Sequence, residues 1–306
     1  MPAAKHTGPL PHIPAKITIP TFATKSKQVG QTEIHSSLSF YYTGISSLWL
    51  WYHADLEMLR AYLDPLGMTP YSFGRKTGAV NINFFNAAAM YGQGQPGNQG
   101  IGGFNETEIN IVGFATKVAQ HVPQGLSLRH FLTTGDVTKR LGNYRVWVAC
   151  DDPIAVAAGR QVFMENKFLT PYTYNVPGLN NPRPSPDEFT SEWKCHDPDK
   201  TTHLIYHATV NLAGLSPVPG NMSEVIDLSF DAKTKRPVAS RRNYFGMYDT
   251  YLQRGVGRAV TLGYGASKHP MRHDMIRLIG DAKPVAIQRF QSPPCIAEVA
   301  GYYADV

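Results

Sequence analysis

Short segments in which apolar and polar residues alternate occur along most of the sequence, and glycine or proline residues separate them. The clearest are residues 33–43, 79–92, 106–118, 144–150, 203–212 and 224–232. A period of two residues is that of a β-strand, whose successive side chains point to opposite faces of the sheet. The 27 glycines and 23 prolines supply turn residues between such strands. The sequence therefore predicts a mainly β, antiparallel, barrel-like protein.

Helical periodicity is rarer and predicts only a few flanking helices. Three segments show it, residues 53–67, 152–163 and 268–281. The second begins with Asp152 followed by Pro153, which is a strong start signal for a helix. No internal repeat is present. We therefore expect an α+β chain in which strands dominate.

The 306 residues are sufficient for one large domain. Residues 1–30 are rich in proline and predict an arm that is either disordered or laid along a neighbouring molecule. Residues 31–306 are expected to form a single domain. Charged residues make up 17% of the chain, against about 25% in ordinary soluble domains. A large buried interface would explain this difference, so we expect a homo-oligomer.

The composition also narrows the classes of partner. No run approaches the roughly 18 apolar residues that a membrane-spanning helix needs, and residues 1–20 lack the apolar centre of a signal peptide. The three cysteines are far apart, which is typical of a protein in the reducing cytoplasm. The net charge of +6 is scattered, and no nucleic-acid motif accompanies it. We therefore expect a cytoplasmic protein that binds neither membrane nor nucleic acid.

A glycine-rich segment, GQGQPG at residues 92–97, formally fits the dinucleotide-binding pattern. That pattern requires a strand before it and a helix after it, so that the phosphates meet a helix N-terminus. Here Pro96 and more glycines follow, and then a predicted strand. We expect no cofactor, and interpret residues 91–103 as a loop able to cover a pocket.

One lysine lies in an apolar segment, GRQVFMENKFLTPY at residues 159–172. Lys167 has Phe163, Phe168 and Tyr172 nearby in the sequence. An amine that acts as a nucleophile must be uncharged part of the time, and an apolar environment favours the uncharged form. A lysine whose stem lies along apolar surface with its charge in water is the more common arrangement. The residues alone leave both interpretations open.

Two carboxylates and two histidines are further candidates. Glu106 and Glu108 are two apart on a predicted strand and therefore share a face. If that face is buried, at least one carboxylate must be paired or functional. His269 and His273 are four apart on a predicted helix, which places both on one side. They could support a metal-dependent hydrolase of β-diketones, although the zinc-protease pattern is absent and we expect no metal.

The order of these segments resembles that of acetoacetate decarboxylase-like proteins over residues 35–175. WLWYHADLEMLRAYLDPLGM (49–68) is similar to the strand and helix that open that family. AVNINFFNAAAM (79–90) and GGFNETEINIVGFA (102–115) resemble its paired strands, which carry a glutamate. NYRVWVACDDPIAVAAGRQVFMENKFL (143–169) resembles its most distinctive stretch, a strand, an acidic turn, an Ala-rich helix and a lysine.

The resemblance implies a cone-shaped antiparallel β-barrel with a Schiff-base lysine in an apolar cavity. Lys167 would be the nucleophile and Glu106 the central acid. His53 would serve as an alternate acid or base, as would Tyr172. The substrate-binding wall would comprise Phe163, Phe168, Tyr172 and Asn83. The implied reaction is decarboxylation of a keto acid or β-dicarbonyl compound through an iminium intermediate.

Departures from the family pattern leave the reaction open. Phe168 stands where decarboxylases of the family carry a second lysine, His53 where an arginine is expected, and Asn83 where a second glutamate is expected. Residues 117–142 lengthen the segment between Glu106 and Lys167. Members without the paired lysine carry out aldol condensation with dehydration, or cyclisation, and these departures favour that group. A barrel that binds a small ligand without catalysis is the remaining alternative.

Overall fold

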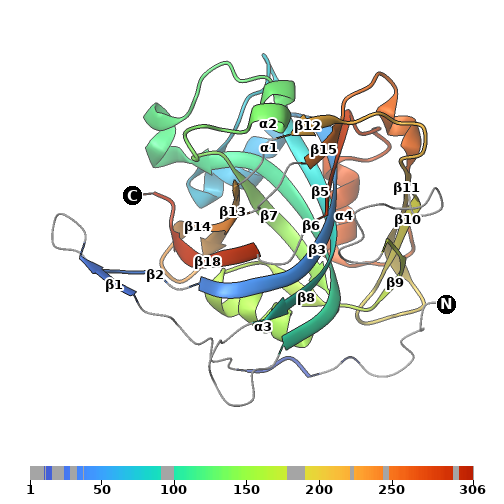
Figure 1. The fold of residues 1–306 in the computed structure, drawn as a ribbon, viewed down its shortest axis with the longest axis horizontal. Helices are drawn as coiled ribbons and strands as arrows, with labels where there is room; N and C mark the ends of the chain where they lie inside the picture. Colours follow the sequence, from blue (N-terminus) through green and yellow to red (C-terminus); the bar gives the residue numbers. More distant parts are fainter. Residues whose placement is uncertain are drawn as a thin grey trace.

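The computed structural model describes residues 10, 12–15, 24–27, 33–36, 38–90, 100–177, 190–220, 224–243, 248–291 and 296–305. Within these residues the chain forms a twelve-stranded sheet, a four-stranded sheet and a two-stranded hairpin of β1 (Thr24–Lys27) and β2 (Glu33–Ser36). Four α-helices of seven to ten residues flank the sheets (Figure 1). The prediction of a mainly β protein with few helices is confirmed.

Seven strands of the large sheet are linked pairwise in a closed series. In order they are β3 (Leu38–Asp55), β18 (Ile296–Tyr303), β14 (Arg236–Asn243), β13 (Glu224–Asp231), β7 (Gly142–Cys150), β6 (Gly100–Ala115) and β5 (Thr77–Met90). The series closes because β5 pairs with both β3 and β6. All of these pairs are antiparallel except that of β7 with β13. The cone shape implied by the family resemblance stays a prediction.

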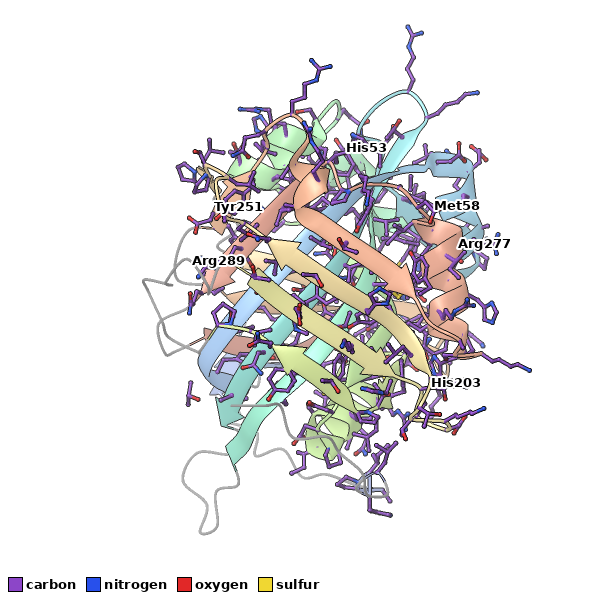
Figure 2. The ribbon with its side chains drawn as sticks, turned by 90° about the vertical axis from the view of Figure 1, so that its right-hand side faces the viewer. His53, Met58, His203, Tyr251, Arg277 and Arg289 are labelled. Atoms are coloured by element: carbon purple, nitrogen blue, oxygen red, sulfur yellow. The ribbon has the colours of Figure 1, made fainter. Side chains whose placement is uncertain are left out.

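Shorter strands extend this series. β17 (Ala286–Gln291), β15 (Tyr248–Tyr251) and β12 (Val218–Gly220) continue outward from β3, β4 (Met68–Pro70) pairs with β6, and β8 (Lys167–Leu169) pairs in parallel with β7. The four-stranded sheet has the order β16 (Val260–Tyr264), β11 (Leu204–Asn211), β10 (Thr190–His196) and β9 (Tyr172–Asn175). Figure 2 shows it in front of the large sheet.

Both faces of the long strands are buried. On β3, Leu48 and Leu50 belong to a core shared with Trp193 of the smaller sheet. Trp49 belongs to a second core, inside the closed series, which includes Phe85 of β5. Alternate residues enter different cores. The alternation in the sequence therefore predicts a strand but does not indicate which of its faces points toward a site.

The helices begin at residues that can cap them. α1 (Leu56–Leu63) starts after Asp55, whose carboxylate accepts from the N–H of Met58 at 3.0 Å. The predicted helix at 53–67 therefore starts later than expected, because residues 53–55 still pair with β5. A 3₁₀ turn, Asp64–Leu66, completes it. α4 (Pro270–Leu278) confirms the predicted helix at 268–281.

The segment 117–142 forms a cover at the end of the molecule away from α3 (Pro153–Val162) (Figure 1). It contains most of a 3₁₀ helix, Thr116–His121, and α2 (Leu128–Thr134). Phe131 of α2 packs edge-on against Trp51, with ring centroids 6.0 Å apart, and belongs to the core inside the closed series. A further 3₁₀ helix is Val256–Ala259.

Residues 10 and 12–15 of the N-terminal arm lie close to the protein's own helix α3 (Pro153–Val162). Leu10 and Ile13 pack on the inner core, and Gln161 of α3 donates to the carbonyls of Pro14 and Ala15 at 3.4 Å each. These few residues contact their own chain, and the expectation of an arm that is disordered or laid along a neighbour stays a prediction. None of the helices in the described ranges is long and apolar enough to cross a membrane.

Candidate active site

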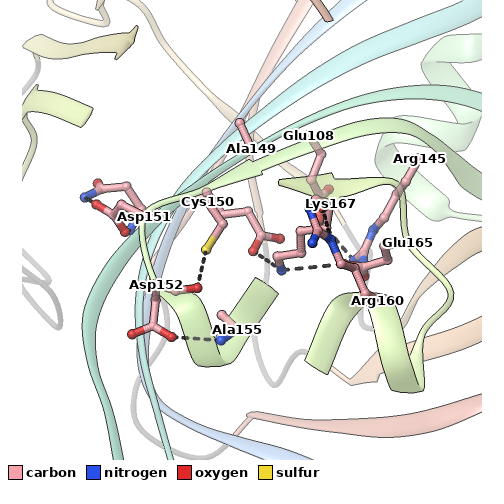
Figure 3. A network of polar contacts seen from close by, with 12 residues as sticks. Glu108, Arg145, Ala149, Cys150, Asp151, Asp152, Ala155, Arg160, Glu165 and Lys167 are labelled. Atoms are coloured by element: carbon pink, nitrogen blue, oxygen red, sulfur yellow. Dashed lines mark hydrogen bonds and ion pairs between the residues drawn. The ribbon is translucent and has the colours of Figure 1, made fainter. Parts of the chain in front are cut away.

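A strand, a capped helix and a short return strand position Lys167. β7 leads to Asp152, whose carboxylate accepts from the N–H groups of Ile154 and Ala155 at 2.8 Å each and so begins α3. After α3 the chain turns at Met164, which has φ 56°. It then returns as β8, so that Lys167 pairs with Val148 of β7. The predicted helix at 152–163 is confirmed and carries the chain directly to the candidate lysine (Figure 3).

The side chain of Lys167 is buried between two carboxylates. It is 7% exposed, and its ammonium group forms an ion pair with Glu106 of β6. A second carboxylate oxygen, Oε2 of Glu165, lies 3.5 Å from the Lys167 Nζ atom. A Cβ atom on Gly159 of α3 would overlap both Lys167 and Glu165. The helix can pack this closely over the lysine only because residue 159 has no side chain.

A network of buried charges continues from Glu165 into the interior. Arg145 of β7 pairs with Glu165, and its Nη2 atom lies 3.0 Å from Oε1 of Glu108 and 2.6 Å from Oδ2 of Asp227. Arg242 contacts the same two carboxylates, Glu108 at 2.8 Å and Asp227 at 2.6 Å. Every member is at most 6% exposed. Burial without loss of charge is possible here because each ion has an oppositely charged partner.

The electrostatics keep Glu108 ionised. Its burial raises the pKa, but Arg145 and Arg242, together with hydrogen bonds from the amides of Asn83 and Asn110, lower the pKa to about 2. Glu106 and Glu108 therefore share the interior face, as their spacing predicts. Glu106 faces the lysine, whereas Glu108 is held by the two arginines.

Glu106 is held in place through its neighbour Asn105. The N–H and side-chain amide of Asn105 donate to the Asp151 carboxylate at 2.7 and 2.9 Å. This contact ties β6 to the turn between β7 and α3. Burial, offset in part by these hydrogen bonds, raises the pKa of Asp151 to about 6.

A small cavity adjoins Lys167. Its volume is about 20 Å³, slightly more than the roughly 10–15 Å³ that one water needs. Its walls combine charged and apolar side chains: Tyr42, Phe104, Glu106, Arg145, Ala155, Ala158, Gly159, Phe163, Glu165 and Lys167. Lys167 thus adjoins a water-sized space whose wall is partly charged and partly apolar.

Phe163 lines this cavity, but the structure places Phe168 and Tyr172 elsewhere. Phe168 follows Lys167 on β8, so its side chain points to the opposite face, where it stacks on His269 with ring centroids 4.1 Å apart. Tyr172 is buried in the core shared with the smaller sheet, and its hydroxyl donates to the carbonyl of Ala149 at 3.1 Å. Neither lines the cavity beside Lys167, and their role in substrate binding stays a prediction.

His53 and Asn83 also lie outside the cavity wall. His53 is exposed near the end of β3, toward the top of Figure 2, and pairs with Ala79. Asn83 is buried in the charged network, where it donates to Glu108 at 3.1 Å and accepts from Ser47 at 2.8 Å. The structure therefore brings together Lys167, Glu106 and Phe163 and separates them from His53.

Sequence reasoning missed Arg145, Glu165, Asp227 and Arg242. Glu165 carries a usable signal, because it is two residues from Lys167, the spacing that places side chains on one side of an extended segment. Asp227 and Arg242 come from β13 and β14 and carry no local signal. Arg242 belongs to KTKRPVASRR, which resembles an ordinary basic surface segment.

The two histidines considered for a metal have other surroundings. His269 caps α4, since its Nδ1 atom accepts from the N–H of Met271 at 3.2 Å. Burial lowers the pKa of His269, and Asp197 and Asp199 oppose that effect. In the part of the chain that the structure describes, no three histidine, cysteine or acidic residues are grouped as metal ligands would be. The loop 91–103 falls outside the described residues except for 100–103, which begin β6.

No family model and no curated protein matches the sequence. Solved structures do match the fold. The enduracididine biosynthesis enzyme MppR complexed with pyruvate has a TM-score of 0.55 and 13% identity, over 94% of this chain and 98% of that chain. The same enzyme complexed with the condensation product of pyruvate and imidazole 4-carboxaldehyde has a TM-score of 0.54 and 13% identity, over 95% and 98%. An acetoacetate decarboxylase-like enzyme from Sphingomonas wittichii RW1 has a TM-score of 0.50 and 12% identity, over 86% and 91%. The chain therefore shares its fold with these enzymes.

Proposed function

We propose that the protein is an enzyme in which Lys167 forms a Schiff base with a carbonyl compound and promotes carbon–carbon bond chemistry beside it. One observation carries the proposal: the Lys167 amine is buried at a cavity wall and contacts a carboxylate able to take its proton. A nucleophilic lysine requires such a base or a strongly apolar site. The two matched MppR complexes, with pyruvate and with a condensation product, are consistent with carbonyl chemistry on this fold.

Glu106 and Lys167 divide the proton transfers between them. Glu106 accepts a proton from the Lys167 ammonium group, and the free amine adds to the carbonyl carbon. Proton return to the carbinolamine oxygen expels water and leaves an iminium ion. The iminium then accepts the electron pair of a bond to the neighbouring carbon, either C–H or C–C, to form an enamine.

Aldol condensation with dehydration fits the site better than decarboxylation. Decarboxylation needs the electron-accepting iminium and one acid that protonates the enamine carbon afterwards, because the departing carbon dioxide takes no proton with it. Condensation needs a group that removes a proton from the neighbouring carbon and one that later protonates a hydroxyl leaving group. Glu106 and Glu165, both in contact with Lys167, supply two carboxylates for these steps.

A barrel that only binds an acidic ligand is the second candidate. In that case Lys167 would pair with the ligand's carboxylate. The Lys167 ammonium group is already paired with Glu106, and a ligand carboxylate would have to displace Glu106 from this buried ion pair. Breaking a buried pair leaves one charge uncompensated and costs about 3–5 kcal/mol. The observed contact therefore favours catalysis.

Proton exchange tests the proposed function. We expect the protein to catalyse incorporation of deuterium at the α-carbon of a simple ketone in D₂O, followed by NMR. Lys167→Arg keeps the charge but cannot form an imine, so the catalysed exchange should disappear. Glu106→Gln should lower the rate about 100-fold, the usual contribution of a general base. Unchanged exchange in Lys167→Arg would exclude the proposed role.

A further inference from the structure

Among the residues that the structure describes, the buried charges around Lys167 are unequal in number. The cations are Lys167, Arg145 and Arg242, and the carboxylates in contact with them are Glu106, Glu108, Glu165 and Asp227. Four carboxylates thus share three cations. Glu108 remains ionised throughout the neutral range, because its pKa is lowered to about 2. The cluster carries an excess of negative charge, or holds a proton to offset it.

The described residues of the cavity wall add no positive charge to that of the cluster. Among the described residues that line it, the cations are Lys167 and Arg145, and Arg145 already contacts three carboxylates. The other lining residues, apart from Glu106 and Glu165, are Tyr42, Phe104, Ala155, Ala158, Gly159 and Phe163. A substrate carboxylate would therefore meet aromatic rings, two carboxylates, and two cations that already contact carboxylates.

Helix α3 does not offer an anion site either. Its first turn, where free N–H groups attract anions, is occupied by the Asp152 carboxylate. The cavity meets Ala155 of this first turn, whose N–H already donates to Asp152, and further along the helix Ala158, Gly159 and the C-terminal Phe163. The C-terminal end of a helix carries a partial negative charge, which opposes an anion.

We propose that the carbonyl compound that reacts at Lys167 is an uncharged aldehyde, ketone or ester-bearing ketone rather than a keto acid. This inference rests on the proposed function and names its substrate class. A carboxylate in the cavity would be a fifth anion against three cations in a buried setting. An uncharged carbonyl adds no charge, and iminium formation keeps the single positive charge that Lys167 already contributes.

Reductive trapping of matched carbonyl pairs tests the inference. The wild-type protein is treated with sodium cyanoborohydride and either pyruvate or methyl pyruvate, and in a second pair with acetoacetate or methyl acetoacetate. Adducts are assigned by peptide mass spectrometry. The exposed Lys233 serves as the internal reference for intrinsic reactivity. The quantity compared is the ratio of the trapping rate of the ester to that of the acid. We expect this ratio to be at least about tenfold larger at Lys167 than at Lys233.

Glu165→Gln shows whether the charge of the cluster is responsible. It removes one anion beside Lys167 and should lower the preference for the ester about tenfold. Asp227→Asn also removes an anion from this cluster. It serves as the test variant if Glu165→Gln does not fold. A preference that neither variant changes would exclude the charge argument.

The outcomes separate the two proposals. Equal or faster trapping of the acids at Lys167 would overturn the inference and leave the Schiff-base function standing. Absence of any adduct at Lys167, with adducts at Lys233, would overturn the proposed function and the inference with it.

Discussion

Lys167 and Phe168 are adjacent in the sequence, yet their side chains point to opposite faces of β8. Lys167 enters the interior and pairs with Glu106, whereas Phe168 stacks on His269 in the core shared with the smaller sheet. A lysine at position 168 would point away from the Lys167 amine. The uncharged neighbour in this chain therefore does not remove a cation from the site.

This arrangement predicts that two buried phenylalanines behave differently. Phe168→Ala should lower the free energy of unfolding by about 3–5 kcal/mol, the usual cost of removing a buried phenyl ring, and should leave the rate of reductive trapping at Lys167 within about threefold. Phe163→Ala removes a phenyl ring from the cavity wall and should lower the rate of reductive trapping at Lys167. Chemical denaturation and peptide mass spectrometry measure both quantities. A loss of trapping in Phe168→Ala that exceeds the loss in Phe163→Ala would contradict the assignment of faces.

Gly159 is predicted to be required for the position of Lys167. A methyl group at this position would overlap the lysine stem and the Glu165 carboxylate. Gly159→Ala should therefore abolish reductive trapping at Lys167 under conditions in which circular dichroism shows that the variant is still folded. Gly103→Ala is the matched control, because nothing lies within 4 Å of a Cβ atom there. Normal trapping in Gly159→Ala would show that the close approach of α3 is unimportant.

The charged network predicts a specific acid sensitivity. The pKa of Glu108 is lowered to about 2 in the folded protein from a usual 4.5. Its contribution to stability is therefore fully present above about pH 4.5 and is lost as the pH falls toward 2. The difference corresponds to about 3 kcal/mol. Denaturant unfolding at pH 7, 4.5 and 3 measures it.

Glu108→Gln should flatten this acid limb and, at pH 7, destabilise the fold by about 3–5 kcal/mol, because Arg145 and Arg242 lose a partner. Glu57→Gln, at an exposed position of α1, should leave the profile unchanged. The same steep acid limb in Glu108→Gln and in the wild type would show that another group is responsible.

Much of the local structure could be predicted because its causes are local. The alternation in residues 79–92 and 106–118 predicts the strands observed as β5 and β6. The Asp152–Pro153 pair predicts the observed start of α3. The helix at 128–134 was missed. Its signal, the cap by Ser127, lies in a segment that was treated only as an insertion.

The composition of the site could be predicted only in part, because strands far apart in the sequence supply it. Lys167 and Glu106 were named from the segment order, and they are in contact. Asp227 and Arg242 reach the same interior from β13 and β14, and nothing in their neighbourhoods marks them. Both faces of the long strands are buried, so alternation could not tell that Phe168 and Tyr172 lie outside the cavity and that Phe163 lines it.

The central claim is that Lys167 forms a covalent imine with a carbonyl substrate. The most direct measurement is peptide mass spectrometry after treatment with methyl pyruvate and sodium cyanoborohydride. We predict an irreversible adduct on Lys167 that forms faster than on Lys233 and is absent from Lys167→Arg, while other lysines react equally in both proteins. Contradiction would come from a wild-type protein whose Lys167 stays unmodified while Lys233 reacts, since the buried amine would then serve only its ion pair with Glu106.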